Sequence, residues 1–177
     1  MDRVRKFLLE LLFDKKVSFF APKDDDKFWD SLVKIASKQL MIPAVYEKLE
    51  NTNQLGKIPV ELKNYLKNIY YVNKKRNENI LIEMSIIESK LKQNGINFIF
   101  LKGASLLKTI YKKKVGVRMM HDVDLLVDEN HILKAKEILN NLNYHDRGFD
   151  NILVTGIHLP ILINKEKSIG VELHNLL

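Results

Sequence analysis

The sequence predicts an α+β fold in which a helical N-terminal region, residues 1–94, packs on a small mixed β-sheet formed by residues 95–177. Two observations carry this prediction. Apolar residues recur at three- and four-residue spacing through the first ninety positions, as on the buried face of a helix. After Gly95 the pattern changes to short β-prone runs that alternate with helical segments. Helices followed by such a mixture indicate one sheet covered by helices.

Four helices are expected in the N-terminal region. They cover residues 4–12, 28–40, 44–49 and 59–94. The acidic run 24–26 can cap the second helix, since side-chain oxygens there accept from the free backbone N–H groups. Pro43 and Pro59 suit first helical turns. The last helix ends at Asn94-Gly95, residue types that adopt the left-handed conformation readily.

The second half is expected to form β-α-β-α-β-β-β. The strands are residues 96–101, 122–127, 151–155, 158–163 and 169–173, and the helices are residues 104–111 and 132–139. Asp128 can cap the second of these helices. Residues 164–167 are expected to form a hairpin turn.

Composition sets limits on the function. The 177 residues are 46% hydrophobic, which excludes a disordered chain. The absence of Cys excludes disulfides and thiolate metal ligands. The N-terminal segment reads as an amphipathic helix rather than a signal peptide, and no apolar run approaches the ~20 residues of a membrane span. The expected location is the cytoplasm.

The net charge of +7 is concentrated in one third of the chain. Residues 63–118 hold 13 Lys and Arg against 3 Glu, and the excess ends just before Asp122-Val123-Asp124. A basic stretch leading into a carboxylate pair suits a site that binds a polyphosphate together with metal ions. Lysine makes up 24 of the 29 basic residues, so genomic base composition is an alternative explanation.

Asp122 and Asp124 are two residues apart on a predicted strand, so both carboxylates point to one face. Two like charges held together need a positive partner, and hard divalent cations bind carboxylate oxygens. A solvated strand end is the alternative for such a pair.

Upstream, a buried strand turns directly into a helix at Lys102-Gly103-Ala104-Ser105. Free N–H groups at such a turn attract phosphate, and Gly103 allows close approach. Arg118 could clamp a phosphate through its planar fork of donors. A simple tight turn and a surface arginine are the alternatives.

Four spaced motifs resemble the uncharacterised nucleotidyltransferase family of the polymerase-β-like superfamily. They are Phe100–Leu107, Val117-Arg118, His121–Val127 and Val171-Glu172-Leu173-His174, and the helical segment 34–49 also fits. The resemblance implies a polymerase-β-like sheet on which Asp122, Asp124 and Glu172 act as catalytic carboxylates and hold two Mg²⁺ (or Mn²⁺) ions.

The resemblance also implies that Gly103 and Ser105 cradle the phosphates of an NTP such as ATP, with Lys102 and Arg118 as further phosphate contacts. Two metal ions would then activate the attacking oxygen and stabilise the leaving pyrophosphate. The chain departs from the superfamily at Ala104, which separates the glycine from the serine. It ends five residues after Glu172, which is expected of a truncated chain or of a minimal form whose last residues pack on a helix or in a homo-oligomer.

His174 lies on the same strand face as Glu172, and a packed, hydrogen-bonded histidine is favoured over a substrate contact. Of the lysines, Lys102 and Lys108 are expected to face the carboxylates together with Arg118, whereas 112–114 are expected to be solvated. A His-Asp phosphohydrolase and a glycosyltransferase are disfavoured, the first because it needs further histidines and the second because its fold needs a longer α/β half.

The favoured function is transfer of an NMP group from an NTP to an unidentified hydroxyl acceptor, which could be RNA, protein or a small molecule. The alternative is a non-catalytic nucleotide- or RNA-binding protein, such as a toxin–antitoxin partner, that retains the fold.

Overall fold

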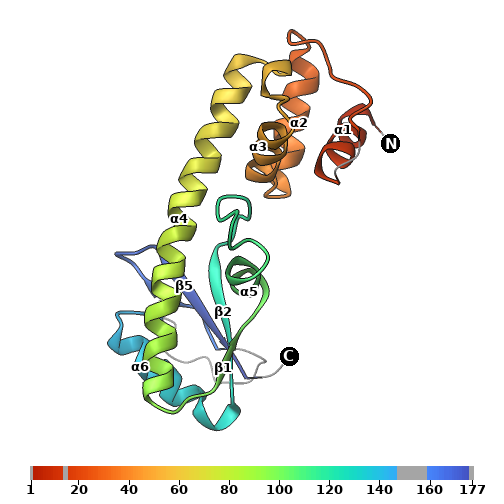
Figure 1. Cartoon of the computed structure of the whole chain (residues 1–177). Coiled ribbons are helices and arrows are strands. Elements are labelled where there is room, and N and C mark those ends of the chain that lie inside the picture. The colour runs from red at the N-terminus through yellow and green to blue at the C-terminus, as the bar shows by residue number, and fades with distance from the viewer. Residues whose placement is uncertain (1, 14–15, 147–158, 176–177) are drawn as a thin grey trace. The chain divides into compact units, whose positions relative to one another are not determined.

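The computed structural model of the chain describes residues 2–13, 16–146 and 159–175 (Figure 1). The helices are α1 (Arg3–Leu12), α2 (Asp26–Lys38), α3 (Ile42–Asn51), α4 (Val60–Gln93), α5 (Lys102–Lys108) and α6 (Ile132–Asn141), with short 3-10 turns η1 (Leu55–Lys57) and η2 (Glu129–His131). The strands are β1 (Phe98–Phe100), β2 (Asp122–Val127), β3 (His145–Asp146), β4 (Leu162–Asn164) and β5 (Ile169–His174). The predicted α+β class is confirmed.

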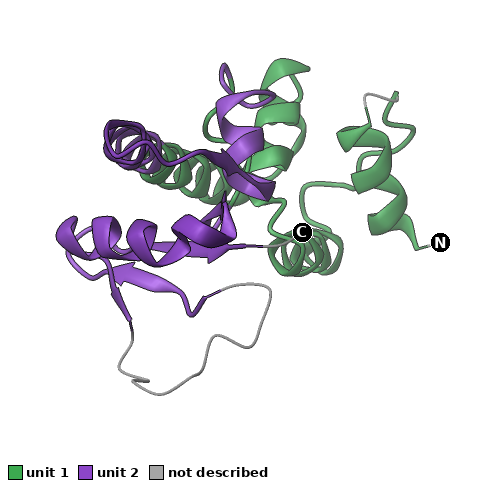
Figure 2. Ribbon diagram, turned by 90° about the horizontal axis from the view of Figure 1, so that it is seen from below, with its two compact units in different colours: residues 1–77, 114–119 green, residues 78–113, 120–177 purple. Residues whose placement is uncertain are grey.

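The chain divides into two compact units (Figure 2). Unit 1 comprises residues 1–77 and 114–119, and unit 2 comprises residues 78–113 and 120–177. Helix α4 contributes residues to both units, so the units do not follow the chain order. A domain boundary between residues 94 and 95 stays a prediction. None of the helices in the described ranges combines the length and apolarity needed to cross a membrane.

Unit 1 is built around aromatic side chains from its first two helices and the segment between them. Phe7 of α1 is 1% exposed and meets the rings of Phe20, Phe28 and Trp29 edge to face, with centroids 5.2–6.1 Å away. Asp25 caps α2 as predicted, because its Oδ1 accepts from the N–H of Phe28 at 3.2 Å. Such edge-to-face contacts stabilise a core beyond the area that they bury.

The segment before β2 is tied to α4 by two buried asparagines, all within unit 1. Asn73 donates from Nδ2 to the carbonyls of Gly116 and Arg118 at 2.8 and 3.0 Å, and Asn77 donates to the carbonyl of Arg118 at 2.7 Å. Gly116 packs so closely on Tyr70 that a Cβ would lie 2.7 Å from its ring. These contacts fix the backbone around Arg118 against the helix.

Unit 2 contains one sheet with the strand order β1-β2-β5-β4-β3. Among the strands of the described ranges, β2 and β5 pair in parallel, and the β1–β2, β3–β4 and β4–β5 pairs are antiparallel. Helix α5 packs on β1 and β2, and α6 packs on β5. The parallel register sets Asp122 opposite Gly170 and Asp124 opposite Glu172. Within each strand, fully buried apolar residues such as Val123 and Val171 separate these positions.

Most predicted elements of unit 2 are confirmed. β2 has the predicted bounds, β5 is one residue longer, and β1 and β4 are shorter than predicted. The hairpin between β4 and β5 is confirmed, but its turn occupies residues 165–168 rather than 164–167, because β4 extends through Asn164. The N–H of Lys167 donates to Oδ1 of Asn164 at 3.1 Å. β3 was not predicted, because its two residues have no periodicity to detect. The predicted strand 151–155 lies outside the described residues.

Candidate active site

Two carboxylates lie side by side on the central strands of the sheet. Asp124 on β2 and Glu172 on β5 are register partners, so their side chains leave the same face. The side chain of Asp124 is 5% exposed and that of Glu172 is 19% exposed. Like charges directly opposite each other on neighbouring strands destabilise a sheet unless a positive group lies between them.

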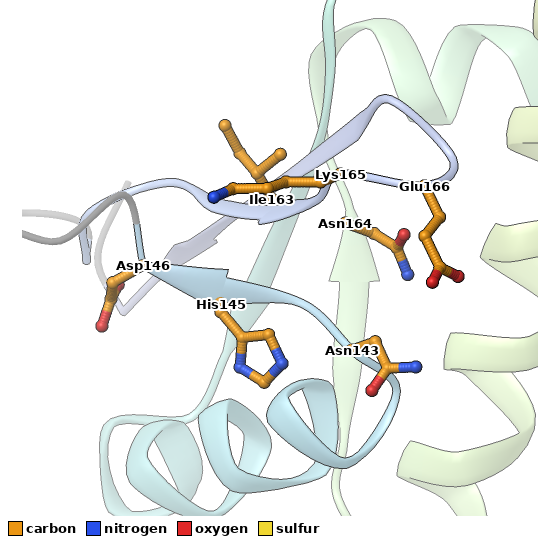
Figure 3. Close-up of a pocket in the computed structure, with 7 residues that line it drawn as sticks. All are labelled: Asn143, His145, Asp146, Ile163, Asn164, Lys165 and Glu166. Atoms are coloured by element: carbon orange, nitrogen blue, oxygen red, sulfur yellow. The ribbon is translucent and has the colours of Figure 1, made fainter.

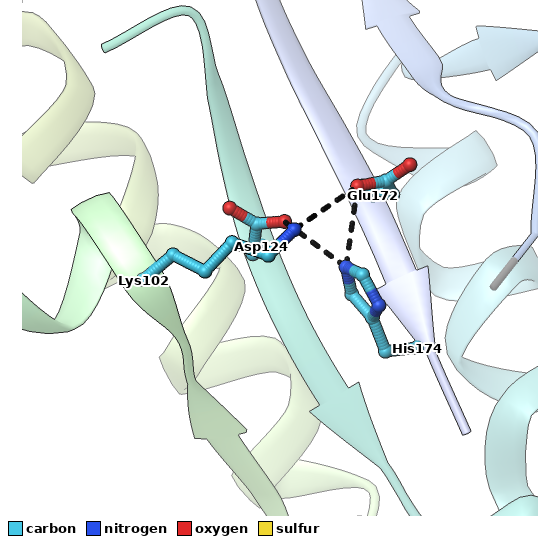
Figure 4. A network of polar contacts seen from close by, with 4 residues as sticks. All are labelled: Lys102, Asp124, Glu172 and His174. Carbon is cyan, nitrogen blue, oxygen red and sulfur yellow. Dashed lines mark hydrogen bonds and ion pairs between the residues drawn. The ribbon is translucent and has the colours of Figure 1, made fainter. Parts of the chain in front are cut away.

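Lys102 and His174 lie against both carboxylates (Figure 4). Nζ of Lys102 is 2.5 Å from Oδ1 of Asp124 and 3.7 Å from Oε2 of Glu172. Nε2 of His174 is 3.0 Å from the same Oδ1 and 3.2 Å from the same Oε2. Four side chains from α5, β2 and β5 thus converge on one point, and we call them the carboxylate–lysine–histidine cluster.

The environment of the cluster keeps Asp124 ionised. Burial alone would raise the pKa of Asp124, but hydrogen bonds from Lys102 and His174 outweigh burial and hold that pKa below its usual range. The hydrogen bond to Asp124 in turn raises the pKa of Lys102. Asp124 is therefore an anion at neutral pH, as a metal ligand must be.

The turn between β1 and α5 brings Lys102 to the cluster. The N–H of Leu101 donates to the carbonyl of Asp124 at 2.9 Å, which extends the β1–β2 ladder by one residue. Lys102 has φ of 43°, whereas Gly103 is not among the residues with positive φ. The left-handed residue of this turn is thus the lysine and not the glycine. A non-glycine residue held in the left-handed backbone region costs about 1–3 kcal/mol of folding free energy, and such strain is common at functional sites.

The donor atoms of Asp124, Glu172 and His174 all lie within 4.8 Å of one another, in the one such group of three found in the described ranges. Two carboxylate oxygens and an imidazole nitrogen are a fitting donor set for a divalent metal ion. Asp122, Asp124 and Glu172 were predicted from the sequence as the metal ligands, but Asp122 is not part of this group of three. Its charge does contribute to the raised pKa of Lys102.

The other predicted nucleotide-binding residues occupy two units. Gly103 is buried and Ser105 half-buried, both on α5 of unit 2. Arg118 belongs to unit 1, where its Nε is buried without a hydrogen-bond partner. The part that each of these three residues plays in nucleotide binding stays a prediction.

Several lysines of the basic stretch already have acidic partners. Lys108, which was expected to face the carboxylates, instead forms an ion pair with Glu88 on α4, and Lys92 pairs with the same carboxylate. Lys114 pairs with Glu47 in unit 1 at 2.5 Å. The net charge of residues 63–118 therefore overstates the positive charge that is available to a ligand.

A second group of polar residues on the same sheet lacks such convergence. A cavity of about 580 Å³ is lined by Asn143, His145, Asp146, Ile163, Asn164, Lys165 and Glu166 (Figure 3). His145 and Asp146 are neighbours on β3, so their side chains leave opposite faces of the strand. Among the described residues, the acids and the histidine of this cavity do not form a group of three close metal-ligating atoms.

Sequence reasoning favoured a packing role for His174, and the structure adds its contacts with two candidate metal ligands. The available signal was the two-residue spacing from Glu172, which places both side chains on one strand face. What the spacing could not give was the parallel register with β2, which brings Asp124 to the same place.

Comparison with known proteins identifies the family. A search of curated proteins and a search of solved structures each found no match. A sequence model described as "uncharacterised nucleotidyltransferase" matches residues 25–177, which include the cluster and both central strands. The chain therefore belongs to the uncharacterised nucleotidyltransferase family.

Proposed function

We propose that this protein is a metal-dependent nucleotidyltransferase that moves an NMP group from an NTP to a hydroxyl acceptor. The observation that carries the proposal is the pairing of Asp124 and Glu172 across β2 and β5, beside the lysine that begins α5. The two charges repel unless a cation lies beside them, and the ammonium of Lys102 lies against both carboxylates. Such an arrangement suits a site that binds a divalent metal ion together with the phosphates of a nucleotide.

Asp124 and Glu172 are the proposed metal ligands and catalytic carboxylates, with Asp122 as a third carboxylate on the same strand face. A divalent ion such as Mg²⁺ or Mn²⁺, when bound, supplies charge that activates the attacking oxygen and stabilises the leaving pyrophosphate. Glu172 is the more exposed of the pair and is proposed to face the acceptor hydroxyl. The carboxylates also repel any phosphate that arrives without a cation, which couples nucleotide binding to metal binding.

Lys102, Gly103, Ser105 and Arg118 are the proposed phosphate-binding residues. Lys102 is supported by geometry, since its ammonium lies on the carboxylates and more than half of its side chain is exposed. Gly103 and Ser105 are supported by their place in the first turn of helix α5, directly after Lys102. Arg118 is supported by its chemistry, because a guanidinium binds phosphate oxygens with two parallel donors.

Nucleotide transfer can be tested directly. The full chain is incubated with each α-labelled NTP, Mg²⁺ or Mn²⁺, and pools of tRNA, protein and small hydroxyl compounds. We expect label on one pool, and we expect it to vanish in Asp124→Ala and Asp122→Ala. Glu83→Gln serves as a control, since it removes a buried carboxylate of the same unit outside the cluster. NTP binding without transfer to any pool would support a non-catalytic binding protein instead.

A further inference from the structure

We propose that Asp124, Glu172 and His174 bind a single divalent ion through two oxygens and one imidazole nitrogen, and that His174 shifts the metal preference of the site from Mg²⁺ toward transition ions such as Zn²⁺ and Co²⁺. The inference rests on the proposed function, because it assigns the metal preference of the same site. It makes His174 a determinant of metal specificity rather than a packing residue.

The spacing of the three donor atoms fits one ion. Ligands that lie about 2.1 Å from a metal ion are about 3.0 Å apart when adjacent in an octahedron and about 3.4 Å apart in a tetrahedron. Nε2 of His174 is 3.0 Å from Oδ1 of Asp124 and 3.2 Å from Oε2 of Glu172. Both spacings fall in this range, and the three donor atoms all lie within 4.8 Å of one another. An ion bound by them would take the place of the Lys102 ammonium, which lies 2.5 Å from Oδ1 of Asp124.

The contacts of His174 favour an ion over a hydrogen bond alone. Nε2 faces two carboxylate oxygens, but a ring nitrogen carries at most one proton and serves one of them well. A metal ion between the three atoms satisfies all of them at once. The side chain of His174 is 8% exposed, and its place on β5 holds the ring beside Glu172. A fixed, buried nitrogen is not readily replaced by a water molecule.

The nitrogen decides which ions the site prefers. Mg²⁺ takes oxygen ligands in a strict octahedron and keeps several of its waters, so an imidazole is a poor ligand for it. Transition ions such as Zn²⁺ bind imidazole nitrogen well. Carboxylate oxygens accept both classes of ion. The identity of residue 174 is therefore the feature of the cluster that separates the two classes.

The first test compares equilibrium metal affinities, measured by calorimetry on the full chain. Any oxygen site binds Zn²⁺ more tightly than Mg²⁺, so the informative quantity is the change between variants. We expect His174→Gln to weaken Zn²⁺ binding at least about tenfold, the lower end of the loss seen for residues that support metal ligands. Mg²⁺ binding should change less than about threefold, because the amide oxygen of glutamine can replace the nitrogen.

His145→Gln is the matched control, since it makes the same substitution on the same sheet outside the cluster. It should leave both affinities unchanged. Equal losses of Zn²⁺ and Mg²⁺ binding in His174→Gln, or no loss of either, would overturn the inference while leaving the proposed function in place. Failure of the unaltered chain to bind any divalent ion would overturn both.

A second test needs no variant and so does not depend on how well His174→Gln folds. In the Co²⁺-loaded chain, a histidine bound through Nε2 carries its exchangeable proton on Nδ1, next to a paramagnetic ion. We expect one strongly shifted proton NMR signal that disappears in D₂O. Co²⁺ bound at the site with no such signal would contradict nitrogen ligation.

Discussion

Two buried groups of unit 2 each contain a carboxylate beside a lysine, yet their surroundings differ. Glu83 on α4 is 7% exposed, and its Oε2 accepts from the hydroxyl of Tyr144 at 3.1 Å and pairs with Nζ of Lys167 at 2.8 Å. One anion, one cation and one neutral donor leave no charge uncompensated. The Glu83 group thus behaves as a structural link between α4, the residue before β3 and the β4–β5 turn.

The carboxylate–lysine–histidine cluster is arranged differently, because it contains a second carboxylate and a histidine. Two carboxylates share the ammonium of Lys102, whose backbone is held at positive φ. The difference indicates that the partners of a buried acid in this protein distinguish a structural role from a role in binding cations. A single satisfied carboxylate holds elements together, whereas a pair with a shared, strained counter-ion is poised to accept a further cation.

The largest expected effect is a loss of nucleotidyl transfer when the carboxylate–lysine–histidine cluster is altered. Asp124→Asn should lower nucleotidyl transfer at least about 10³-fold, since it removes a charge that the metal ion needs. Its free energy of unfolding should change by less than about 1 kcal/mol, because relief of repulsion with Glu172 offsets the lost ion pair. Transfer of labelled nucleotide and urea denaturation measure the two quantities. A variant that retains full transfer would place the chemistry elsewhere.

Substitution in the Glu83 group should lower the stability of the fold without changing metal affinity. Glu83→Gln is expected to destabilise the fold by about 1–2 kcal/mol, because a buried hydrogen-bonded charge is lost while Lys167 stays partly solvated. Metal affinity should stay as it is. Urea denaturation and calorimetry on the same preparation test both statements, and weakened metal binding would show that the two groups are not independent.

The third prediction concerns the lysines at the two ends of α5. Lys102→Met removes the ammonium that shares oxygens with a metal ion, so we expect divalent-ion affinity to rise about tenfold. Lys108→Met removes an equal charge that pairs with Glu88 instead, and it should leave the affinity unchanged. Weaker binding in Lys102→Met would mean that the lysine supports the metal rather than competing with it.

The smallest effect is the contribution of Glu88 to the pH dependence of stability. Hydrogen bonds from Lys108 and then Lys92 lower the pKa of Glu88 from its ordinary value of 4.5. Its stabilisation is therefore fully present above that pH and is lost as the pH falls through the lower, folded-state pKa. Glu88→Gln should cost less than about 1 kcal/mol at pH 7 and almost nothing at pH 2. Urea midpoints at both values measure it, and an equal cost at both would contradict the ion-pair origin.

Much of the fold could be predicted because its signals are local. Helical spacing, the Asp25 cap and the alternation along β2 each depend on neighbours within a few residues. The proximity of Asp124 and Glu172 was expected from the family resemblance alone, since 48 residues separate them and only the parallel register joins them.

Other features of the site depend on distant or unusual geometry. The pairing of Lys108 depends on how α4 and α5 pack, which residue spacing does not encode. The positive φ of Lys102 was unexpected, because a neighbouring glycine is the residue type that adopts this conformation most readily. Arg118 was predicted to contact a phosphate because it precedes Asp122 and Asp124 in the sequence. In the structure its backbone carbonyl accepts hydrogen bonds from Asn73 and Asn77, all within unit 1.

The most direct test of the central claim is anomalous diffraction from crystals grown with Mn²⁺ and a non-hydrolysable NTP analogue. The account predicts one or more anomalous peaks within bonding distance of Asp124 and Glu172, with the triphosphate beside Lys102. A bound nucleotide whose metal ions lie away from both carboxylates, with Lys102 still paired to Asp124, would contradict it.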